Sequence, residues 1–365
     1  MLTLKKIKSY HSQLIGICIT MFCFLPFSIM AQEDEGNAEP SYNIEKIKKE
    51  SEGGNTNAMM ILASAYMAGK GVSKDSVEAL KWYTRSAEKG NANAMYMLGY
   101  LYDNGKAIPK DTTLALKWYT EGAEAGNSNA QNNLGLKYRK GRWVTRDYKK
   151  AMKLFKRSAE AGNPYGMLNL GHMYQYAKGV HRDNETALEW YLKAAQKTNI
   201  KIGCYILGYF YEYGKGGLTV DIPTAISFYT KQVSKEERAA CLYRLGNIYE
   251  YGKGNIKADN TEAMKYYQAS ADLGNITGMY FLGHLYELDQ KNTEADRWYK
   301  TAFESCKKEI ARSIDDTELM ICLAMMYESG RGTEKSTEQA MLWYKQAAEL
   351  GNEEAELKLK EVKGN

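Results

Sequence analysis

The sequence predicts an all-α fold built from about eight stacked helix-turn-helix repeats of 36 to 38 residues. Nearly the same eight letters return along the chain, as LGYLYDNG from residue 98, LGLKYRKG from 134, LGYFYEYG from 207 and LGNIYEYG from 245. Aligned on the glycine of LG, with Ala63 and Ala324 in its place at the ends, the repeats follow at intervals of 36, 36, 36, 37, 38, 37 and 41 residues. Because a catalytic motif is normally written once, a motif that returns at a fixed interval indicates architecture.

Residues 1–31 have the composition of an export signal. Basic residues precede an apolar run from Leu14 to Met30, and a cut is expected ahead of Gln32. An uncleaved anchor is the alternative, but this run of 17 residues contains Pro26, whereas a spanning helix needs about 20 apolar residues. We therefore expect an exported protein, located in the periplasm, at the cell envelope or outside the cell, with no membrane span after cleavage.

The charge balance disfavours a nucleic-acid partner. Without residues 1–31 the chain has 46 basic and 44 acidic residues, a net charge of +2. Binding to a phosphate backbone needs a concentrated basic face, and none stands out in the sequence.

Four cysteines remain after residue 31. They are Cys204, Cys241, Cys306 and Cys322. Cys204 and Cys241 occupy the same element of neighbouring repeats, one residue out of register. A disulfide between them and two buried small apolar side chains are both open interpretations.

The first helix of each repeat is predicted from a small residue, Leu, Gly and Tyr at helical spacing. In residues 93–104 these are Ala94, Leu98, Gly99 and Tyr102. A glycine inside a helix costs about 1 kcal/mol relative to alanine, so its return indicates that a partner helix approaches where a Cβ would stand. In the next repeat, Lys137 lies two residues after the glycine Gly135, and its side chain is expected to be exposed. The tyrosine three residues after the Gly position is present in every repeat and is expected in the core. It is found at Tyr66, Tyr102, Tyr138, Tyr174, Tyr211, Tyr249, Tyr286 and Tyr327.

The loop and the second helix complete each repeat. Many loops read GKG or GRG, as at 69–71, 252–254 and 330–332. Helix C-caps explain these glycines better than a phosphate loop, because the G-x-x-x-x-G-K-[ST] motif is missing. The second helix is predicted to begin at a capping residue four before an Ala. The capping residues are Asp75, Asp111, Asp147, Asp183, Asp221, Asp259 and Ser336. An Ala, aromatic, Ala stripe at i, i+4 and i+8 follows, and successive pairs must stack to bury it.

Residues 55–351 resemble the Sel1-like repeat family, a longer-looped relative of the tetratricopeptide repeat. The matching features are the A…L-G-x-x-Y helix, the G-x-G loop, the capping Asp and the segment A-L-K-W-Y-x-x-x-A-E-x-G. The resemblance implies a right-handed, tetratricopeptide-like α-solenoid that acts as a scaffold for a protein or peptide partner. Residues 32–54 are then an acidic linker and an N-terminal capping helix, and residues 352–365 a C-terminal capping helix. The pattern departs near 231–238 and 304–316, where we expect a kink or an altered stacking angle.

The resemblance also implies a concave groove, lined by the residues three before and one after the repeat glycine. Aromatic side chains with a polar tip give contact area at low entropic cost, which suits a peptide or glycan groove. An inert solvated face, with the tyrosines packed on their neighbours, is the alternative. The candidate partner-binding residues are Tyr96, Tyr100, His172, Tyr205, Tyr209, Tyr243, Tyr280 and His284.

Enzyme motifs are nearly absent, so we expect no catalytic activity, no metal site and no cofactor. The H-E-x-x-H motif is missing. Ser86 and Lys89, like Ser305 and Lys308, satisfy the S-x-x-K pattern of penicillin-recognising enzymes, but the S-D-N and K-T-G companions are missing. The leading hypothesis is an exported, non-enzymatic scaffold that binds its partner through the concave face. The alternative is a cell-wall-directed protein that binds glycan or acts on β-lactams.

Overall fold

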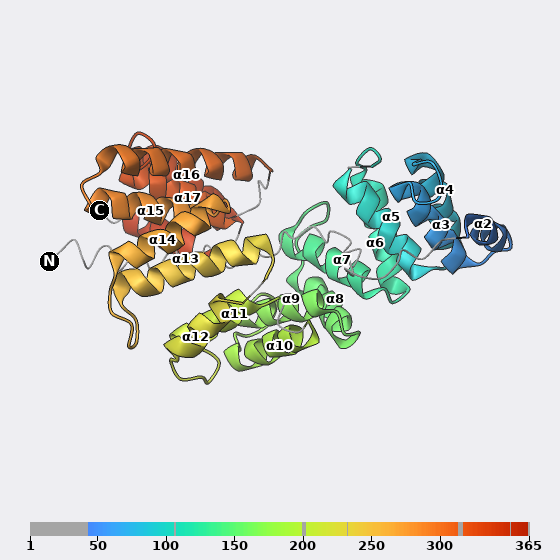
Figure 1. The fold of residues 1–365 in the computed structure, drawn as a ribbon, viewed down its shortest axis with the longest axis horizontal. Helices are drawn as coiled ribbons and strands as arrows, with labels where there is room; N and C mark the ends of the chain where they lie inside the picture. The colour runs from blue at the N-terminus through green and yellow to red at the C-terminus, as the bar shows by residue number, and fades with distance from the viewer. Residues whose placement is uncertain are drawn as a thin grey trace. The chain divides into compact units, whose positions relative to one another are not determined.

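The computed structural model describes residues 43–105, 107–198, 202–231, 233–312, 317–350 and 352–363, and the regular secondary structure in these ranges is all helical (Figure 1). The predicted signal peptide and the linker up to residue 42 lie outside these ranges. The described residues fall into two compact units, 43–198 and 202–363. In each unit the two helices of a repeat pack side by side and each pair packs on the next. The predicted all-α architecture of stacked helical repeats is confirmed.

The first unit consists of the short helix α2 (Ile44–Glu52) and four helix pairs. The pairs are α3 (Thr56–Ala68) with α4 (Ser76–Glu88), α5 (Ala92–Asn104) with α6 (Thr112–Glu124), α7 (Ser128–Lys140) with α8 (Tyr148–Glu160), and α9 (Pro164–Gln175) with α10 (Asn184–Lys197). Leu62, Trp82 and Leu98 belong to one buried cluster that joins the first two pairs.

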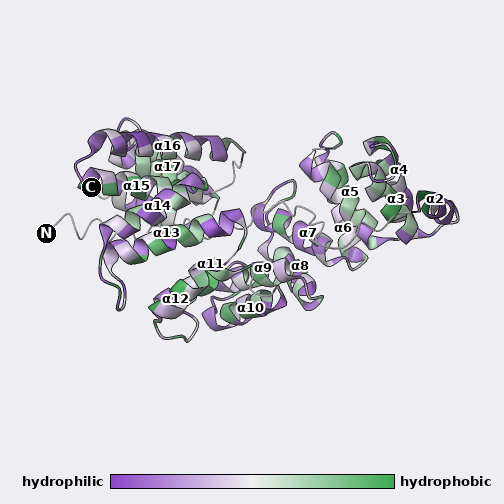
Figure 2. Cartoon of the chain, viewed as in Figure 1, coloured by the Kyte–Doolittle hydropathy of each residue, from purple (hydrophilic) through white to green (hydrophobic). Residues whose placement is uncertain are grey.

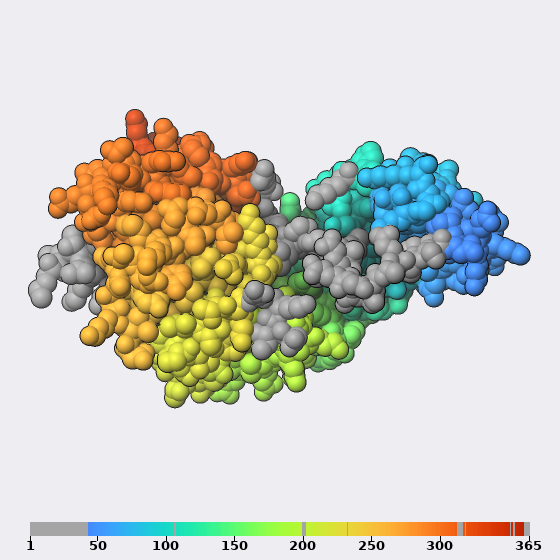
Figure 3. Space-filling model, in the orientation of Figure 1, coloured from blue at the N-terminus to red at the C-terminus, as the bar shows by residue number. Residues whose placement is uncertain are grey.

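The second unit has four further pairs and a terminal helix, α19 (Glu353–Lys363). The pairs are α11 (Cys204–Tyr213) with α12 (Ile222–Tyr229), α13 (Lys235–Tyr251) with α14 (Asn260–Asp272), α15 (Ile276–Leu288) with α16 (Asn292–Arg312), and α17 (Thr317–Ser329) with α18 (Thr337–Glu349). Hydrophilic residues cover the outer side of α16 (Figure 2), and Figure 3 shows one face of this unit in space-filling form.

Helix lengths change where the sequence departs from its pattern. Helix α12 has only 8 residues, and α13 is lengthened to 17. Helix α16 continues for 21 residues, so part of the stretched exit after residue 304 is helical. Residues 232 and 313–316 lie outside the described ranges. The kink or altered stacking angle at these places stays a prediction.

The repeat glycine of each first helix faces an aromatic ring of the second helix, as predicted. A Cβ placed on Gly99 would lie 2.6 Å from Cδ1 of Tyr119, and one on Gly135 would lie 2.7 Å from Cε1 of Phe155. Both rings are fully buried. The same contact is made by Gly171, Gly208, Gly246 and Gly283. A Cβ at any of these six positions would lie 2.9 Å or less from the ring, which explains why the helix-interior glycine returns.

Replacing Gly135 by valine is expected to lower the free energy of unfolding by about 1 to 3 kcal/mol, because the branched side chain overpacks the contact with Phe155. A urea melt followed by helicity measures this loss. Lys153→Ala, on the exposed side of α8, is the control and should change the midpoint little. Equal midpoints for the two variants would contradict the packing role of the glycine.

All seven predicted N-caps of the second helices are confirmed. The Asp75 carboxylate accepts hydrogen bonds from the backbone N–H groups of Val77 and Glu78, both at 2.9 Å. The same role is taken by Asp111, Asp147, Asp183, Asp221, Asp259 and Ser336. The sequence analysis did not anticipate that asparagine caps most first helices. These caps are Asn55, Asn91, Asn127, Asn163 and Asn275. Capping therefore explains why these polar residues recur.

The first glycine of each GKG or GRG loop is a helix C-cap, as predicted. Gly69, Gly252 and Gly330 have φ angles of 74°, 60° and 75°, in the left-handed region that glycine enters without strain. Each donates its N–H to the carbonyl four residues back, as Gly252 does to Ile248.

The tyrosine three residues after the repeat glycine was expected in the core, and it packs against the core with its side chain partly exposed, as at Tyr66 and Tyr138. It is half-buried in all eight repeats. It lies at the end of the first helix, and in two repeats its ring stacks on a ring of the second helix, Tyr211 on Phe228 at 5.6 Å and Tyr249 on Tyr266 at 5.3 Å between ring centres. Its carbonyl accepts the N–H of the capping residue, as between Tyr66 and Asp75 at 2.9 Å. The side chain thus borders the core at the end of the first helix.

The four cysteines after residue 31 are buried, and they form no disulfide among the described residues. Burial raises the pKa of Cys204 to about 12 and that of Cys241 well above its ordinary value. Of the two interpretations, the structure has the buried small side chains and not the Cys204–Cys241 disulfide.

None of the helices within the described ranges is long and apolar enough to cross a membrane. The same residues include no group of three or more His, Cys, Asp or Glu side chains placed to hold a metal ion.

Candidate binding face on the first helices

Buried polar side chains gather on the first helices of the repeats. In the described helix pairs, every buried Asn, Gln, His, Arg and Glu inside a helix lies on a first helix, whereas the buried polar residues of the second helices are serines. The residues are Gln131, Asn132, Arg139, Asn169, His172, Gln175, Glu212, Glu237, Arg244, Asn247 and His284. Burying a polar group costs free energy unless it finds a hydrogen-bond partner, so packing alone does not explain this asymmetry.

The eight predicted groove residues all lie on first helices, and seven of them are buried. The half-buried residue is Tyr100. The buried ones are Tyr96, His172, Tyr205, Tyr209, Tyr243, Tyr280 and His284. Tyr96 packs on Tyr119 and Tyr243 on Tyr267, with ring centres 6.4 and 6.0 Å apart. The rings therefore belong largely to the stack, and partner binding by these eight residues stays a prediction.

The residue four positions after the repeat glycine recurs in a role that sequence reasoning missed. It accepts a hydrogen bond from the hydroxyl of the second-helix tyrosine, as Glu212 does from Tyr229 at 2.8 Å. The other acceptors are Asp103, Gln175, Glu250, Glu287 and Glu328. In the third repeat the ring is Phe155, which has no hydroxyl, and Arg139 stands at the acceptor position. Comparing the residue four after the glycine with the aromatic residue of the second helix across the repeats would have revealed that the two form a pair.

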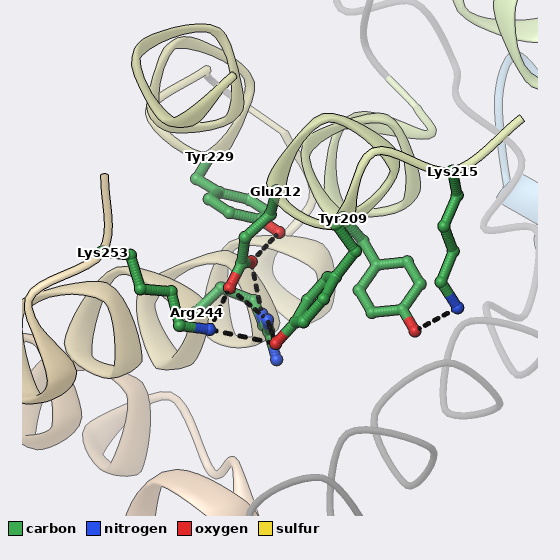
Figure 4. Close-up of polar contacts among 7 residues, drawn as sticks. Tyr209, Glu212, Lys215, Tyr229, Arg244 and Lys253 are labelled. Atoms are coloured by element: carbon green, nitrogen blue, oxygen red, sulfur yellow. Dashed lines mark hydrogen bonds and ion pairs between the residues drawn. The ribbon is translucent and has the colours of Figure 1, made fainter. Parts of the chain in front are cut away.

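Glu212 is also the centre of a buried ion cluster (Figure 4). Arg244 of α13 donates to its two oxygens, through Nε at 3.0 Å and through Nη2 at 2.5 Å. Lys253 donates to Glu212 at 2.6 Å. The Tyr213 hydroxyl accepts from Arg244 at 2.7 Å and from Lys253 at 3.0 Å. The side chains of Arg244 and Glu212 are both 0% exposed, so this pair ties the fifth repeat to the sixth inside the protein.

Tyrosine rings surround the Arg244 guanidinium. Its Cζ lies 5.2 Å from the ring centre of Tyr213, 5.7 Å from that of Tyr209 and 5.9 Å from that of Tyr243. A ring face attracts a cation because of its negative quadrupole. Two of these three tyrosines, Tyr209 and Tyr243, are predicted groove residues, so the structure places them around a charge that the sequence analysis did not consider.

The lysines of two GKG loops reach back to this cluster. Lys215 of the first loop donates to the Tyr209 hydroxyl at 2.7 Å, and Lys253 belongs to the second loop. Among the described residues of the cluster, three cations, Arg244, Lys253 and Lys215, therefore accompany one carboxylate. These loops thus supply cations as well as turns.

The pKa values of the cluster follow from burial and charge. Burial alone would raise the pKa of Glu212, but Arg244 and Lys253 hold it below its ordinary value. Burial raises the pKa of Tyr209 to about 12 and that of Tyr229 well above its ordinary range. Glu212 is thus ionised at neutral pH, and both phenols keep their protons.

A similar cluster in the seventh repeat is balanced in charge. Arg331 donates to the Tyr280 hydroxyl at 2.7 Å and to Glu287 at 2.8 Å, and Tyr299 donates to Glu287 at 2.7 Å. Burial, followed by the charge of Arg331, lowers the pKa of the neighbouring His284. One cation meets one carboxylate here, in contrast to the Arg244 cluster.

In the first unit, Lys137 is mostly buried, and the expectation of an exposed side chain was wrong. Its Nζ donates to Asp103 at 2.6 Å, and the side chain is 12% exposed. The ammonium also lies 3.8 Å from the ring centre of Trp143. Lys137 stands two residues after the repeat glycine Gly135, and its partner Asp103 is the acceptor residue of the preceding repeat. Asp103 also accepts a hydrogen bond from the Tyr119 hydroxyl at 3.3 Å.

His172 is an uncharged polar residue of α9, the first helix of the fourth repeat. Burial lowers its pKa well below the ordinary value, because the charged form cannot be hydrated there. Its ring lies 4.5 Å from that of Tyr176, and neither ring nitrogen has a hydrogen-bond partner among the described residues. The neutral imidazole therefore has a donor and an acceptor available.

Ser86 of the S-x-x-K pattern has a structural role. Its hydroxyl donates to the Thr56 carbonyl of the preceding helix at 3.0 Å. Ser158 and Ser270 make the equivalent bonds in other repeats, to the carbonyls of Ser128 and Ala239. A serine that returns with the repeat is explained by packing of the second helix on the first.

The family comparison agrees with this repeat geometry. A model of the Sel1 repeat matches residues 56–91, 92–127, 128–163, 164–199, 202–231, 239–275 and 320–352. The pair α15 and α16, with its clipped loop, lies outside the matched segments. Its Gly283 nevertheless faces Tyr299 as the other repeat glycines face their rings.

Two solved structures of Sel1-type proteins are similar to this chain. A protective antigen of uropathogenic Escherichia coli with an SLR fold has 28% identity and a TM-score of 0.48, covering 88% of this chain and 82% of its own. A Sel1 repeat protein from Oxalobacter formigenes has 26% identity and a TM-score of 0.48, covering 87% and 79%. No curated protein matches the chain. Because the repeat model matches more than half of its residues, the chain belongs to the Sel1 repeat family.

Proposed function

We propose that this chain is an exported, non-enzymatic scaffold that binds a protein or peptide partner through the face formed by its first helices. Sel1 repeats typically mediate protein–protein interactions, and Sel1 scaffolds are generally non-catalytic. The export signal expected in residues 1–31 supports a periplasmic, envelope-associated or secreted location.

The concentration of polar side chains on the first helices carries this proposal. Every residue of an extended peptide offers a backbone N–H and a C=O group. The first helices hold amide, imidazole and guanidinium groups that can pair with them. Four of these side chains, Gln131, His172, Arg244 and His284, have polar atoms without a hydrogen-bond partner among the described residues. A bound peptide would supply the missing partners.

A photo-crosslinking amino acid tests which face meets the partner. We place it at Tyr100, half-buried on the first helix α5, and at Lys117 on the second helix α6, whose side chain is 56% exposed. In a cell-envelope extract we expect a discrete crosslinked product from position 100 and none from position 117. The same product from both positions, or none from position 100, would refute the proposed face.

The export part of the proposal has its own measurement. The mass of the chain recovered from the envelope or the medium should correspond to a start at Gln32. Recovery of the full-length chain from the cytoplasm alone would remove export from the proposal and leave partner binding to be judged by crosslinking.

A further inference from the structure

The second helix α8 carries a concentration of positive charge that the other second helices lack. Together with its cap Asp147, it contains five basic and two acidic residues, a net charge of +3. The other seven second helices, with the caps described above, carry net charges between −2 and +1. Outside this segment, residues 32–365 have 41 basic and 42 acidic residues. The balance of the whole chain therefore conceals a basic helix in the third repeat.

Four lysines form one exposed side of α8. Lys149, Lys153 and Lys156 follow one another at i, i+4 and i+7, which places them in one row along the helix. Lys150 lies beside this row. All four residues are exposed, and the side chains of Lys150 and Lys156 are 63% and 62% exposed. These four lysines form the basic face of α8, which a partner reaches from solvent without entering the protein.

The chain itself neutralises little of the charge on this face. Lys150 and Lys156 each have one acidic neighbour on α8 or its cap, at 3.7 and 3.9 Å. Both pairs are exposed, and an exposed ion pair contributes little. Lys149 and Lys153 have no ion-pair partner among the described residues. In the adjacent second helices α6 and α10, the described ion pairs likewise join residues of one helix. The basic face is thus available to an external anion.

The composition of the basic face favours a surface of diffuse negative charge. None of the large apolar side chains that are exposed in the described ranges lies on α8, so the face offers no apolar centre for a protein interface. The single arginine of α8, Arg157, is half-buried and donates to the Ala123 carbonyl at 2.9 Å. Arginine suits the paired hydrogen bonds of carboxylate and nucleic-acid recognition, whereas lysine acts as a point charge on a flexible stem. A row of lysines is therefore suited to many loosely arranged anions.

We propose that the basic face of α8 attaches the protein to a membrane surface through the headgroups of anionic phospholipids. Clusters of about four or more basic residues on one helix are attracted to such surfaces by charge. This attachment needs no membrane-spanning segment, and it leaves the first helices available to the partner. The inference rests on the proposed function only for the location of the chain at the cell envelope, where it meets a lipid surface.

Sedimentation with lipid vesicles measures this attachment. The full chain is mixed with vesicles of phosphatidylcholine alone, or of phosphatidylcholine with about one-third phosphatidylglycerol. Each net positive charge near an anionic surface increases binding about fivefold, so the charge of +3 predicts about a hundredfold preference for the anionic vesicles. High salt should abolish the preference, because it screens exposed charges. Equal binding to both kinds of vesicle would overturn the proposal.

Charge-matched variants locate the binding face. Lys149→Gln/Lys153→Gln removes the two lysines without an ion-pair partner and should lower binding to anionic vesicles about 25-fold. Lys265→Gln/Lys345→Gln removes the same charge from second helices of the other unit, at side chains 68% and 69% exposed, and should keep the preference. All variants share residues 1–31, so any contribution of that segment cancels. Circular dichroism checks that the variants fold. Equal losses in both double variants would reduce the effect to overall charge and overturn the proposal.

Competition separates the membrane from two other polyanions. Duplex DNA and polyglutamate are added to the chain bound on anionic vesicles. Release by either one, at a lower concentration of charged groups than the lipid provides, would assign the face to nucleic acid or to an acidic protein and overturn membrane attachment.

The outcome also separates this inference from the proposed function. A crosslinked partner at position 100 without any preference for anionic vesicles would overturn membrane attachment and leave the scaffold function standing. A preference for anionic vesicles that Lys149→Gln/Lys153→Gln abolishes, without a crosslink at position 100, would support the basic face and remove the scaffold function.

Discussion

Replacing Arg244 by methionine is expected to destabilise the second unit by about 3 kcal/mol. The change leaves the carboxylate of Glu212 buried and without its main partner. Breaking a buried ion pair by removing one partner typically costs about 3 to 5 kcal/mol. We expect the lower end of this range, because Lys253 still donates to Glu212 at 2.6 Å.

The loss should be local, because each repeat of a stacked array contacts mainly its neighbours. Hydrogen exchange should therefore rise first in α11 and α13, which supply Glu212 and Arg244. A urea melt gives the total loss. Arg244→Met combined with Glu212→Met removes both charges, and it should recover much of the stability that the single variant loses. A double variant that is less stable than Arg244→Met would contradict this view of the pair.

Local features of the fold were predictable from the sequence because their signals are local. An Asp four residues before an Ala predicted the N-caps, and a glycine inside a helical pattern predicted a close approach. Asparagine capping was missed, because the Gly-Asn pair that follows many second helices has the appearance of a helix end, as at Gly90 and Asn91. It is in fact both an end and a beginning, as at Asn91, which accepts from the N–H groups of Asn93 and Ala94.

The candidate site was less predictable, because its contacts join residues one repeat apart. Glu212 and Arg244 are 32 residues apart, and neither stands in a motif. Lys253 looked like part of a turn, yet its ammonium reaches Glu212 in the preceding repeat. Lys137 looked exposed because only its own helix was considered, whereas Asp103 approaches it from the preceding repeat. Periodicity identifies which positions are equivalent, but not which equivalent positions touch.

The buried carboxyl group of Glu237 is expected to make the second unit less stable as the pH rises. Gly203 is the N-cap of helix α11, and glycine has no side chain to make a capping bond. Glu237 of α13 caps this helix instead, accepting from the N–H of Tyr205 at 3.0 Å. It is 2% exposed, and burial raises its pKa from 4.5 to about 7, although backbone N–H groups partly oppose the shift.

The direction in which stability changes with pH follows from proton binding. A carboxyl group whose pKa is higher in the folded state binds more protons there. Its contribution to the free energy of unfolding is therefore present below pH 4.5 and is lost as the pH rises through about 7. The difference between these two pKa values corresponds to about 3 kcal/mol. Glu237→Gln keeps an oxygen acceptor for Tyr205 and cannot ionise. We therefore expect this variant to match the wild type near pH 4.5 and to exceed its stability at pH 8. Urea melts of both proteins are compared across this pH range. The difference between their stabilities removes the contributions of the groups that they share, such as His172 and His284. Parallel curves for the two proteins would show that Glu237 is not titrating inside the fold.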